Sequence, residues 1–290
     1  MTTPPMPIAV LAGLVPSDEV GRCYRGLDAD APDDYRQLAA LLVDDWRSRA
    51  VHTVGVGGGQ GAGKSTLGRL IVEAGRAFDA HVEVLSIDDF YLTREERHRL
   101  AEDVHPLLAT RGPPGTHDVA LLRATLAALR EPGDVPVPRF DKGVDTRTGY
   151  ETRRGAVDIV VLEGWCVGAT AAEESVGESI NALERDHDAD GLWRSTVEAA
   201  LRTSYAKVFA DLDAMVFLKV PGLEAVRRWR LQQESERRPE QRLTAAGVNR
   251  FVEHYERITR RMLATLPATA DVVVELDDAH RIAGLRFGTF

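Results

Sequence analysis

Residues 57–66 read Gly-Gly-Gly-Gln-Gly-Ala-Gly-Lys-Ser-Thr, and the rest of the chain is interpreted around this stretch. It fits the pattern G-x-x-x-x-G-K-[ST], with Gly58 first, Gly63 and Lys64 in the middle and Ser65 last. Glycines let the backbone turn tightly enough for successive N–H groups to point at one phosphate chain. A helix that begins near Lys64 would add the positive end of its dipole. The stretch therefore predicts a phosphate-binding loop.

The residues on either side of the loop support this prediction. Residues 51–56 have the composition of a buried strand, and residues 66–72 have that of a helix. A glycine-rich turn that binds nothing is the alternative, but Lys and Ser rarely occur at these offsets between a strand and a helix. In this pattern Lys64 reaches the β- and γ-phosphates of a nucleotide, and Ser65 holds a magnesium ion. The predicted nucleotide-binding residues are Gly58, Gly59, Gln60, Gly61, Ala62, Gly63, Lys64, Ser65 and Thr66.

Strands and helices alternate along the remaining chain. Further strands are predicted at 81–87, 157–162, 214–220 and 271–276, and helices at 35–46, 94–102, 193–211, 223–238 and 245–266, with another opening at 117–122. The strand at 271–276 is expected to close the chain. Residues 135–140 contain two prolines, which restrict them to a sheet edge or a loop. This order predicts an α/β fold with a doubly wound, mainly parallel sheet and helices on both faces.

The composition restricts the class of protein. Of the 290 residues, 44% are hydrophobic, which is an ordinary share for a globular protein with a core. The net charge of -9 argues against a nucleic-acid scaffold. The two cysteines, Cys23 and Cys166, imply no disulfide framework and fit a reducing, cytoplasmic location. Residues 1–15 have neither the basic start of a signal peptide nor the length of a membrane span, so no membrane partner is expected.

Acidic residues follow two of the predicted strands. Asp88 and Asp89 come after the strand at 81–87, and Glu163 comes after the strand at 157–162. Ligands of open α/β sheets bind at the carboxyl ends of the strands. Beside a magnesium nucleotide, such acids can hold the metal or its waters, or accept a hydroxyl proton. The alternative is that they only cap helices or loops.

Several longer stretches carry a family resemblance. They read Ser-Ile-Asp-Asp-Phe-Tyr-Leu-Thr (86–93), Arg-Gly-Pro-Pro-Gly-Thr-His-Asp (111–118), Pro-Arg-Phe-Asp-Lys (138–142), Leu-Glu-Gly-Trp-Cys-Val-Gly (162–168), Ile-Asn-Ala-Leu-Glu (180–184) and Trp-Arg-Leu-Gln-Gln-Glu (229–234). They resemble motifs of the ATP-dependent D-glycerate 3-kinase family, over residues 50–275. The resemblance implies a P-loop kinase of the superfamily that contains phosphoribulokinase, uridine kinase and pantothenate kinase, with ATP and Mg²⁺ as cofactors. Residues 1–50 match nothing in that family, so we expect a partly helical N-terminal extension, 1–50, and a P-loop kinase domain, 51–290.

The resemblance also implies catalytic roles. The superfamily motif places the catalytic base at Asp88 rather than Asp89, and it places Glu163 at the acidic position of the Walker B strand. Arg230 falls where related kinases carry lid arginines that neutralise phosphate charge. A surface ion pair between Arg230 and Glu234, four residues later, is an equally good interpretation. The predicted catalytic residues are Asp88, Lys64, Glu163 and Arg230, and the predicted metal ligands are Ser65 and Glu163.

The acceptor site is assigned in the same way. His117 and Asp118 fall where the superfamily contacts acceptor hydroxyls, although an acid at a plain helix N-terminus explains them too. Arg139 and Lys142 follow a rigid proline segment and suit an anionic acceptor, or else they belong to a solvated loop. The acidic stretch at 184–190 is interpreted as solvated surface rather than a metal site. The predicted acceptor-binding residues are Asp88, Tyr91, Arg111, His117, Asp118, Arg139 and Lys142.

The expected activity is transfer of the γ-phosphoryl group of ATP to a small-molecule acceptor, D-glycerate at its 3-hydroxyl, with Asp88 taking the hydroxyl proton. A kinase for another hydroxylated metabolite, such as a nucleoside, a pantothenate-like acid or a sugar phosphate, is the alternative among enzymes. A P-loop ATPase or regulatory switch is the alternative from another class. The acid at the strand end and the acceptor-like loop at 111–118 argue against a switch, and the absence of an Asn-Lys-x-Asp signature excludes a GTPase.

Overall fold

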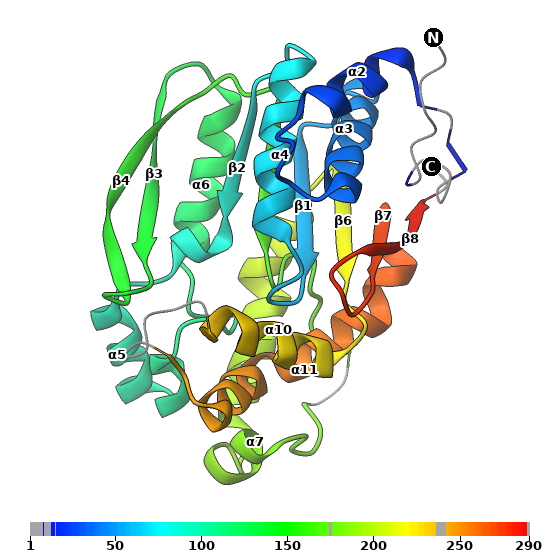
Figure 1. Cartoon of the computed structure of the whole chain (residues 1–290). Helices are drawn as coiled ribbons and strands as arrows, with labels where there is room; N and C mark the ends of the chain where they lie inside the picture. The colour runs from blue at the N-terminus through cyan, green and yellow to red at the C-terminus, as the bar shows by residue number, and fades with distance from the viewer. Residues whose placement is uncertain (1–7, 9–12, 15, 174–175, 236–241, 289–290) are drawn as a thin grey trace.

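The computed structural model describes residues 8, 13–14, 16–173, 176–235 and 242–288. Its centre is a six-stranded sheet with the strand order β2-β5-β1-β6-β7-β8 (Figure 1). The strands are β1 (Thr53–Gly58), β2 (Val82–Ser86), β5 (Ile159–Gly164), β6 (Ala214–Lys219), β7 (Val272–Leu276) and β8 (Ile282–Phe287). Neighbouring strands from β2 to β7 run parallel, and β8 runs antiparallel to β7. The predicted α/β fold with a mainly parallel sheet is confirmed.

The last strand is a correction to the sequence prediction. Residues 271–276 do not close the chain, because β8 follows and pairs with β7 along its edge. The buried side chains of β8 are Ile282 and Leu285, which lie three residues apart. The alternating pattern that marks a half-buried strand is therefore missing from this segment.

Helices cover both faces of the sheet, and each face has its own buried core. The helices are α2 (Asp18–Gly26), α3 (Asp33–Ser48), α4 (Lys64–Ala77), α5 (Arg94–Asp103), α6 (Val119–Arg130), α7 (Ala182–His187), α8 (Leu192–Ala200), α9 (Ala206–Phe209), α10 (Leu223–Ser235) and α11 (Ala245–Thr269). One core contains residues of α2, α3 and α4, and the other contains residues of α6, α8 and much of α11. Every residue of β1 and β5 is buried, as expected for strands covered on both sides.

The predicted helices are observed with shifted ends. The helix expected at 193–211 consists of α8, a π-helical turn (Leu201–Tyr205) and α9 in direct succession. The helix expected at 223–238 is α10, and its predicted end at 236–238 lies outside the described residues. None of the helices in the described ranges combines the length and apolar character that crossing a membrane would need.

A hairpin interrupts the alternation of strands and helices. β3 (Asp134–Asp141) and β4 (Thr146–Arg154) form a separate antiparallel sheet, seen at the left of Figure 1. Both strands of such a pair are edges, which is where the prolines of β3 are tolerated. The end of β3 lies next to the 3₁₀ turn that follows β2 (Ile87–Phe90), because the N–H of Phe140 donates to Asp89 at 3.1 Å. The hairpin therefore lies beside the carboxyl end of the central sheet.

The first described helices pack against the helix that follows the phosphate loop. Leu38, Leu42 and Trp46 of α3 are buried in the same core as Leu67 and Ile71 of α4. α3 is thus held along its length against the β1–α4 unit. The division of the chain into an N-terminal extension and a kinase domain at residue 50 stays a prediction.

Candidate active site

The phosphate loop joins β1 to α4 at the carboxyl edge of the sheet. Gly63 precedes α4 with a φ of 81°, a left-handed conformation that glycine adopts without a Cβ clash. The ammonium group of Lys64 donates to the carbonyl oxygens of Gly58 at 2.8 Å and Gly59 at 3.0 Å. Burial lowers the pKa of Lys64, although the Glu163 carboxylate opposes this. A phosphate bound in the loop would give this partly buried ammonium group an anionic partner.

Ser65, at the start of α4, meets Glu163, near the end of β5. The Ser65 hydroxyl donates to Glu163 Oε1 at 3.5 Å. Burial raises the pKa of Glu163; the charge of Lys64 opposes this shift and that of Asp88 adds to it. A divalent cation would relieve the cost of burying this carboxylate. Hydroxyl and carboxylate oxygens are the hard ligands that Mg²⁺ prefers, so the two residues fit the metal predicted for them.

Each of the two neighbouring aspartates after β2 pairs with a different cation of the hairpin. Asp88 accepts hydrogen bonds from Lys142 Nζ at 2.6 Å and from the Tyr91 hydroxyl at 2.9 Å. Asp89 accepts from Arg139 at 3.1 Å as well as from the hairpin backbone. Burial would raise the pKa of Asp88, but the opposing effects of Lys142 and its other donors hold that pKa below its ordinary value. Asp88 is therefore an ionised carboxylate at neutral pH.

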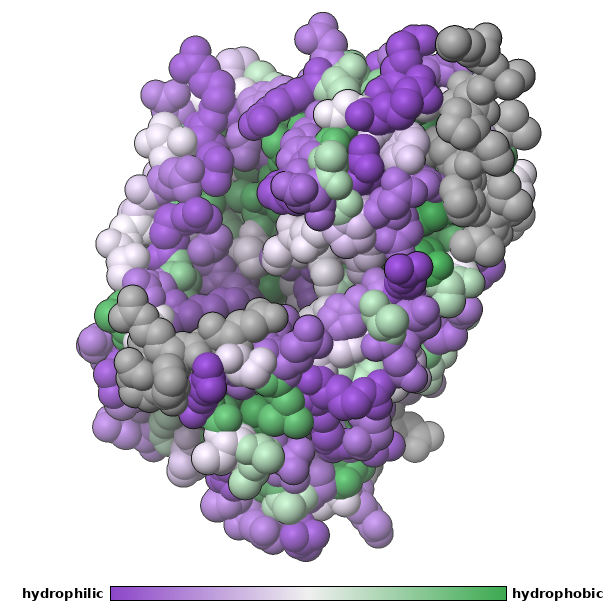
Figure 2. All heavy atoms as spheres, in the orientation of Figure 1, coloured by the Kyte–Doolittle hydropathy of each residue, from purple (hydrophilic) through white to green (hydrophobic). Residues whose placement is uncertain are grey.

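A cavity of about 410 Å³ connects the phosphate loop with Asp88. Figure 2 shows this face of the molecule hollowed between the hairpin and the phosphate loop, with polar side chains along the hollow. The predicted residues on its wall are Gln60, Gly61, Lys64, Ser65, Asp88, Tyr91, Arg111, Lys142, Glu163 and Arg230. The loop, the strand ends and part of the predicted acceptor set thus share one cavity.

Three predicted acceptor residues occupy other positions. His117 is buried behind Tyr91, with ring centroids 4.3 Å apart. Burial lowers the pKa of His117 to about 4, so the imidazole is neutral. Asp118 caps α6 and pairs with Arg147 at 3.3 Å. Arg139 is half exposed, and its second partner after Asp89 lies on β4. The structure does not bring these three side chains to the cavity wall, and their contact with an acceptor stays a prediction.

Arg111 reaches the cavity as part of a charged group that the sequence did not indicate. Its guanidinium pairs with Asp145 in the hairpin turn, and the same carboxylate accepts from Arg97 at 2.8 Å. Arg97 is fully buried, and both guanidinium groups lie over the ring of Phe140. Arg97 stands in a polar helix and Asp145 in a polar turn, so no local pattern marks either residue.

Arg230 lies on α10, where it lines the cavity and pairs with Glu234 at 2.5 Å. Its guanidinium also lies 4.6 Å from the centroid of the Phe251 ring. The ion pair predicted within α10 is present, and Arg230 lies at the cavity wall. Its role in neutralising phosphate charge stays a prediction.

Other wall residues were missed by the sequence reasoning. Trp165 and Gln233 belong to stretches that carried the family resemblance, so their motifs could have identified them. Phe140 belongs to another such stretch. In the sequence, Phe251 and Tyr255 show only that α11 has an apolar face. That face reaches the cavity because α11 crosses the end of the sheet.

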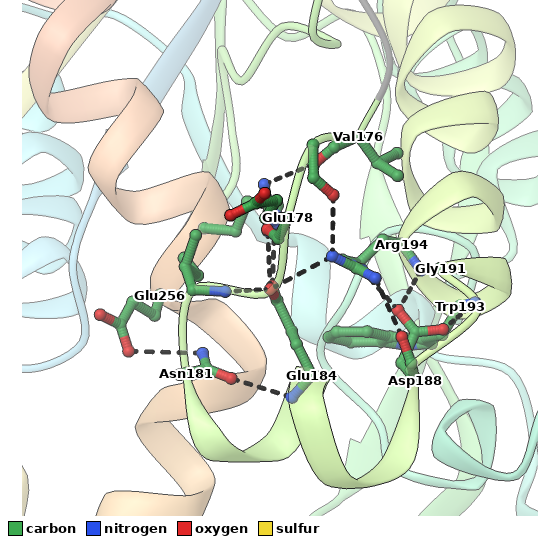
Figure 3. Close-up of polar contacts among 12 residues, drawn as sticks. Val176, Glu178, Asn181, Glu184, Asp188, Gly191, Trp193, Arg194 and Glu256 are labelled. Atoms are coloured by element: carbon green, nitrogen blue, oxygen red, sulfur yellow. Dashed lines mark hydrogen bonds and ion pairs between the residues drawn. The ribbon is translucent and has the colours of Figure 1, made fainter.

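The acidic stretch at 184–190 is not uniformly solvated, which corrects the interpretation from sequence. Glu184 and Asp188 are buried, with exposures of 0% and 1%. Figure 3 shows them joined by Arg194, which donates to Asp188 at 2.8 Å and lies 3.9 Å from Glu184. Arg257 of α11 also donates to Glu184, at 2.6 Å. These ion pairs fasten α7 to α8 and α11.

Known proteins resemble the chain in sequence and in fold. The chain is 31% identical to the uncharacterized kinase mug58 of Schizosaccharomyces pombe over 218 residues, 70% of this chain and 77% of that protein. It is 29% identical to the chloroplastic D-glycerate 3-kinase of Arabidopsis thaliana over 232 residues, 74% of this chain and 48% of that enzyme. The chain thus spans about half of the plant enzyme's length. No protein-family model matches the chain.

Two solved structures share the fold. The YGR205w protein has a TM-score of 0.72 and is 23% identical, with 89% of this chain and 98% of that chain covered. D-glycerate 3-kinase from Cryptococcus neoformans has a TM-score of 0.66 and is 22% identical, with 93% and 96% covered. The phosphate loop, the parallel sheet and the sequence similarity to mug58 agree with one another. The chain therefore belongs to the family of P-loop, ATP-dependent kinases that includes mug58 and D-glycerate 3-kinase, and it is a kinase.

Proposed function

We propose that this kinase transfers the γ-phosphoryl group of ATP to the 3-hydroxyl of D-glycerate. The observation that carries the proposal is the basic wall at the hairpin end of the cavity, formed by Arg111 and Lys142. Arg111 shares Asp145 with the buried Arg97, so two guanidinium groups have one carboxylate between them. The carboxylate of a hydroxy acid would supply a second negative charge for these two cations. Arginine also binds carboxylates with directed hydrogen bonds. The plant relative named D-glycerate 3-kinase supports this choice.

The donor side of the proposal rests on the phosphate loop. The loop N–H groups and Lys64 would bind the phosphates of ATP, with the N-terminus of α4 behind them. Ser65 and Glu163 would hold Mg²⁺, which when bound neutralises charge on the phosphates. Arg230 lines the same cavity and would offset charge that develops on the phosphoryl group during transfer.

In this proposal Asp88 accepts the proton of the attacking hydroxyl. Its lowered pKa keeps it ionised at neutral pH, as a proton acceptor must be. The Tyr91 hydroxyl orients one carboxylate oxygen, and Lys142 binds the other. The carboxylate of the acceptor competes for Lys142 and so leaves the second oxygen of Asp88 open to the acceptor hydroxyl.

The proposal is tested by measuring ADP release from ATP with D-glycerate, L-glycerate, pantothenate and uridine as acceptors. We expect D-glycerate to have the highest kcat/KM and to give 3-phosphoglycerate, which phosphorus NMR distinguishes from the 2-phosphate. A preference for uridine would contradict the basic-wall argument. ADP release that no acceptor stimulates would contradict the whole acceptor assignment and favour an ATPase.

A further inference from the structure

The start of α3 touches the phosphate loop directly. Tyr35 is 3% exposed, and its hydroxyl donates to the carbonyl oxygen of Ala62 at 2.8 Å. Burial raises the pKa of Tyr35, with the charge of Asp34 adding to the effect, so the phenol stays protonated and remains a donor. A buried hydroxyl group without a partner is costly, so this contact defines where the tyrosine side chain sits. A residue of the segment that has no predicted role is thus bonded to the loop.

The carbonyl that Tyr35 holds belongs to the same peptide unit as the N–H of Gly63. In a trans peptide the C=O and N–H point in opposite directions, and the described chain has no cis peptide bonds. Fixing the Ala62 carbonyl toward α3 therefore directs the Gly63 N–H away from α3. The fit is close, because a Cβ added to Gly63 would lie 2.6 Å from the Tyr35 hydroxyl oxygen.

The neighbouring residue, Asp34, fixes α3 to the start of β8. Asp34 accepts a hydrogen bond from the N–H of Ile282 at 2.8 Å, at the start of β8. The turn before β8 is bonded to α10, because Trp229 Nε1 donates to the Asp278 carbonyl at 3.2 Å. Trp229 packs against the other side of the loop, where a Cβ added to Gly61 would lie 2.9 Å from the Trp229 Cβ. The loop is therefore held between α3 and α10.

We propose that Tyr35 is a positioning residue for phosphate binding, which holds the Ala62 carbonyl so that the Gly63 N–H faces the phosphates. This assigns a role to the N-terminal segment in the nucleotide site. The inference rests on the nucleotide-binding role proposed for the loop and is independent of the identity of the acceptor.

The test compares Tyr35→Phe with Tyr24→Phe in the full chain. Each change removes one hydroxyl group and one hydrogen bond near the start of α3, since the Tyr24 hydroxyl donates to Asp33 at 2.9 Å. Titration calorimetry measures ADP affinity, and steady-state rates give KM for ATP and for D-glycerate. We expect Tyr35→Phe to weaken ADP binding and to raise KM for ATP by about two- to tenfold, the worth of one hydrogen bond. KM for the acceptor should stay the same, and Tyr24→Phe should change neither constant.

Thermal unfolding distinguishes a role of Tyr35 in positioning the loop from a role in stabilising the fold. If Tyr35→Phe lowers the melting temperature but binds ADP as the wild type does, the tyrosine is structural and the inference fails. It also fails if both variants weaken ADP binding equally. A wild-type protein that does not bind ADP would instead remove the proposed role of the loop, and the inference with it.

Discussion

Two cations of the hairpin offer a matched test of the acceptor site. Lys142 and Arg139 stand on the same hairpin, and each pairs with one of the neighbouring aspartates, Asp88 and Asp89. Both side chains are about half exposed, 55% for Lys142 and 51% for Arg139, but only Lys142 lines the cavity, and Arg139 also pairs with Glu151. Lys142→Met and Arg139→Met remove the same charge from adjacent places. They differ in whether the cation lines the cavity and in which aspartate it pairs with.

The expected magnitudes follow from these environments. A charge-assisted hydrogen bond to the acceptor carboxylate is worth about 1.5–3 kcal/mol, so Lys142→Met should raise KM for D-glycerate about 10- to 150-fold. An exposed ion pair is worth about 0–1 kcal/mol, so Arg139→Met should change it less than about fivefold. KM for ATP should change little in either variant. Initial rates at saturating ATP over a range of D-glycerate concentrations measure KM for the acceptor, and the converse series at saturating D-glycerate measures KM for ATP.

The pH dependence gives a second readout of the same pair. Lys142 helps to hold the pKa of Asp88 below its ordinary value, against the effect of burial. Without Lys142 the pKa of Asp88 rises, so Asp88 becomes protonated, and stops acting as a base, at a higher pH than in the wild type. The acid limb of kcat/KM should therefore move to higher pH in Lys142→Met but not in Arg139→Met. Equal effects of the two variants on KM, or an unmoved acid limb, would refute this account of the site.

Three further predictions concern the donor site, the base and the fold. Lys64→Ala should abolish phosphoryl transfer and weaken ATP binding, with an unchanged circular dichroism spectrum; turnover at the wild-type rate would remove the phosphate-loop assignment. Asp88→Asn should lower kcat about 10²-fold or more while Asp89→Asn has a small effect, and the reverse order in single-turnover rates would make Asp89 the base. Glu184→Gln leaves Arg257 facing a neutral amide in a buried site, so urea denaturation should show a loss of about 3–5 kcal/mol, and a loss below 1 kcal/mol would contradict the burial argument.

The parts of the fold that were predictable have local signatures. The β1–loop–α4 unit is formed by one continuous stretch of sequence, and the buried strands are continuous apolar runs. β4 was missed because Thr146–Arg154 is almost entirely polar and forms a strand only through its partner, β3. β8 was missed because its buried residues do not alternate. These strands depend on pairing across the sheet, which a local pattern does not contain.

The site likewise contains residues that the sequence could place and residues that it could not. Asp88 and Glu163 were placed correctly at one edge, because parallel strands bring their carboxyl ends together. The sequence could not distinguish Lys142 from Arg139, because only the turn of the hairpin decides which of them faces the cavity. Nor could it show that Glu184 is buried, since Arg257 lies far along the chain. Charge composition predicts solvation only where no distant partner exists.

The position of β1 in the sheet has a consequence for how the kinase is made. Thr53 pairs with Val160 of β5, and Val54 pairs with Ala214 of β6, so both neighbours of β1 are synthesised long after it. Parallel strands pair late, because closing the long loop between them costs conformational entropy before any hydrogen bond between the strands can form. A nascent chain on the ribosome therefore carries the complete phosphate-loop sequence without the sheet that shapes it. Nucleotide binding should therefore appear only after β6 has emerged from the ribosome.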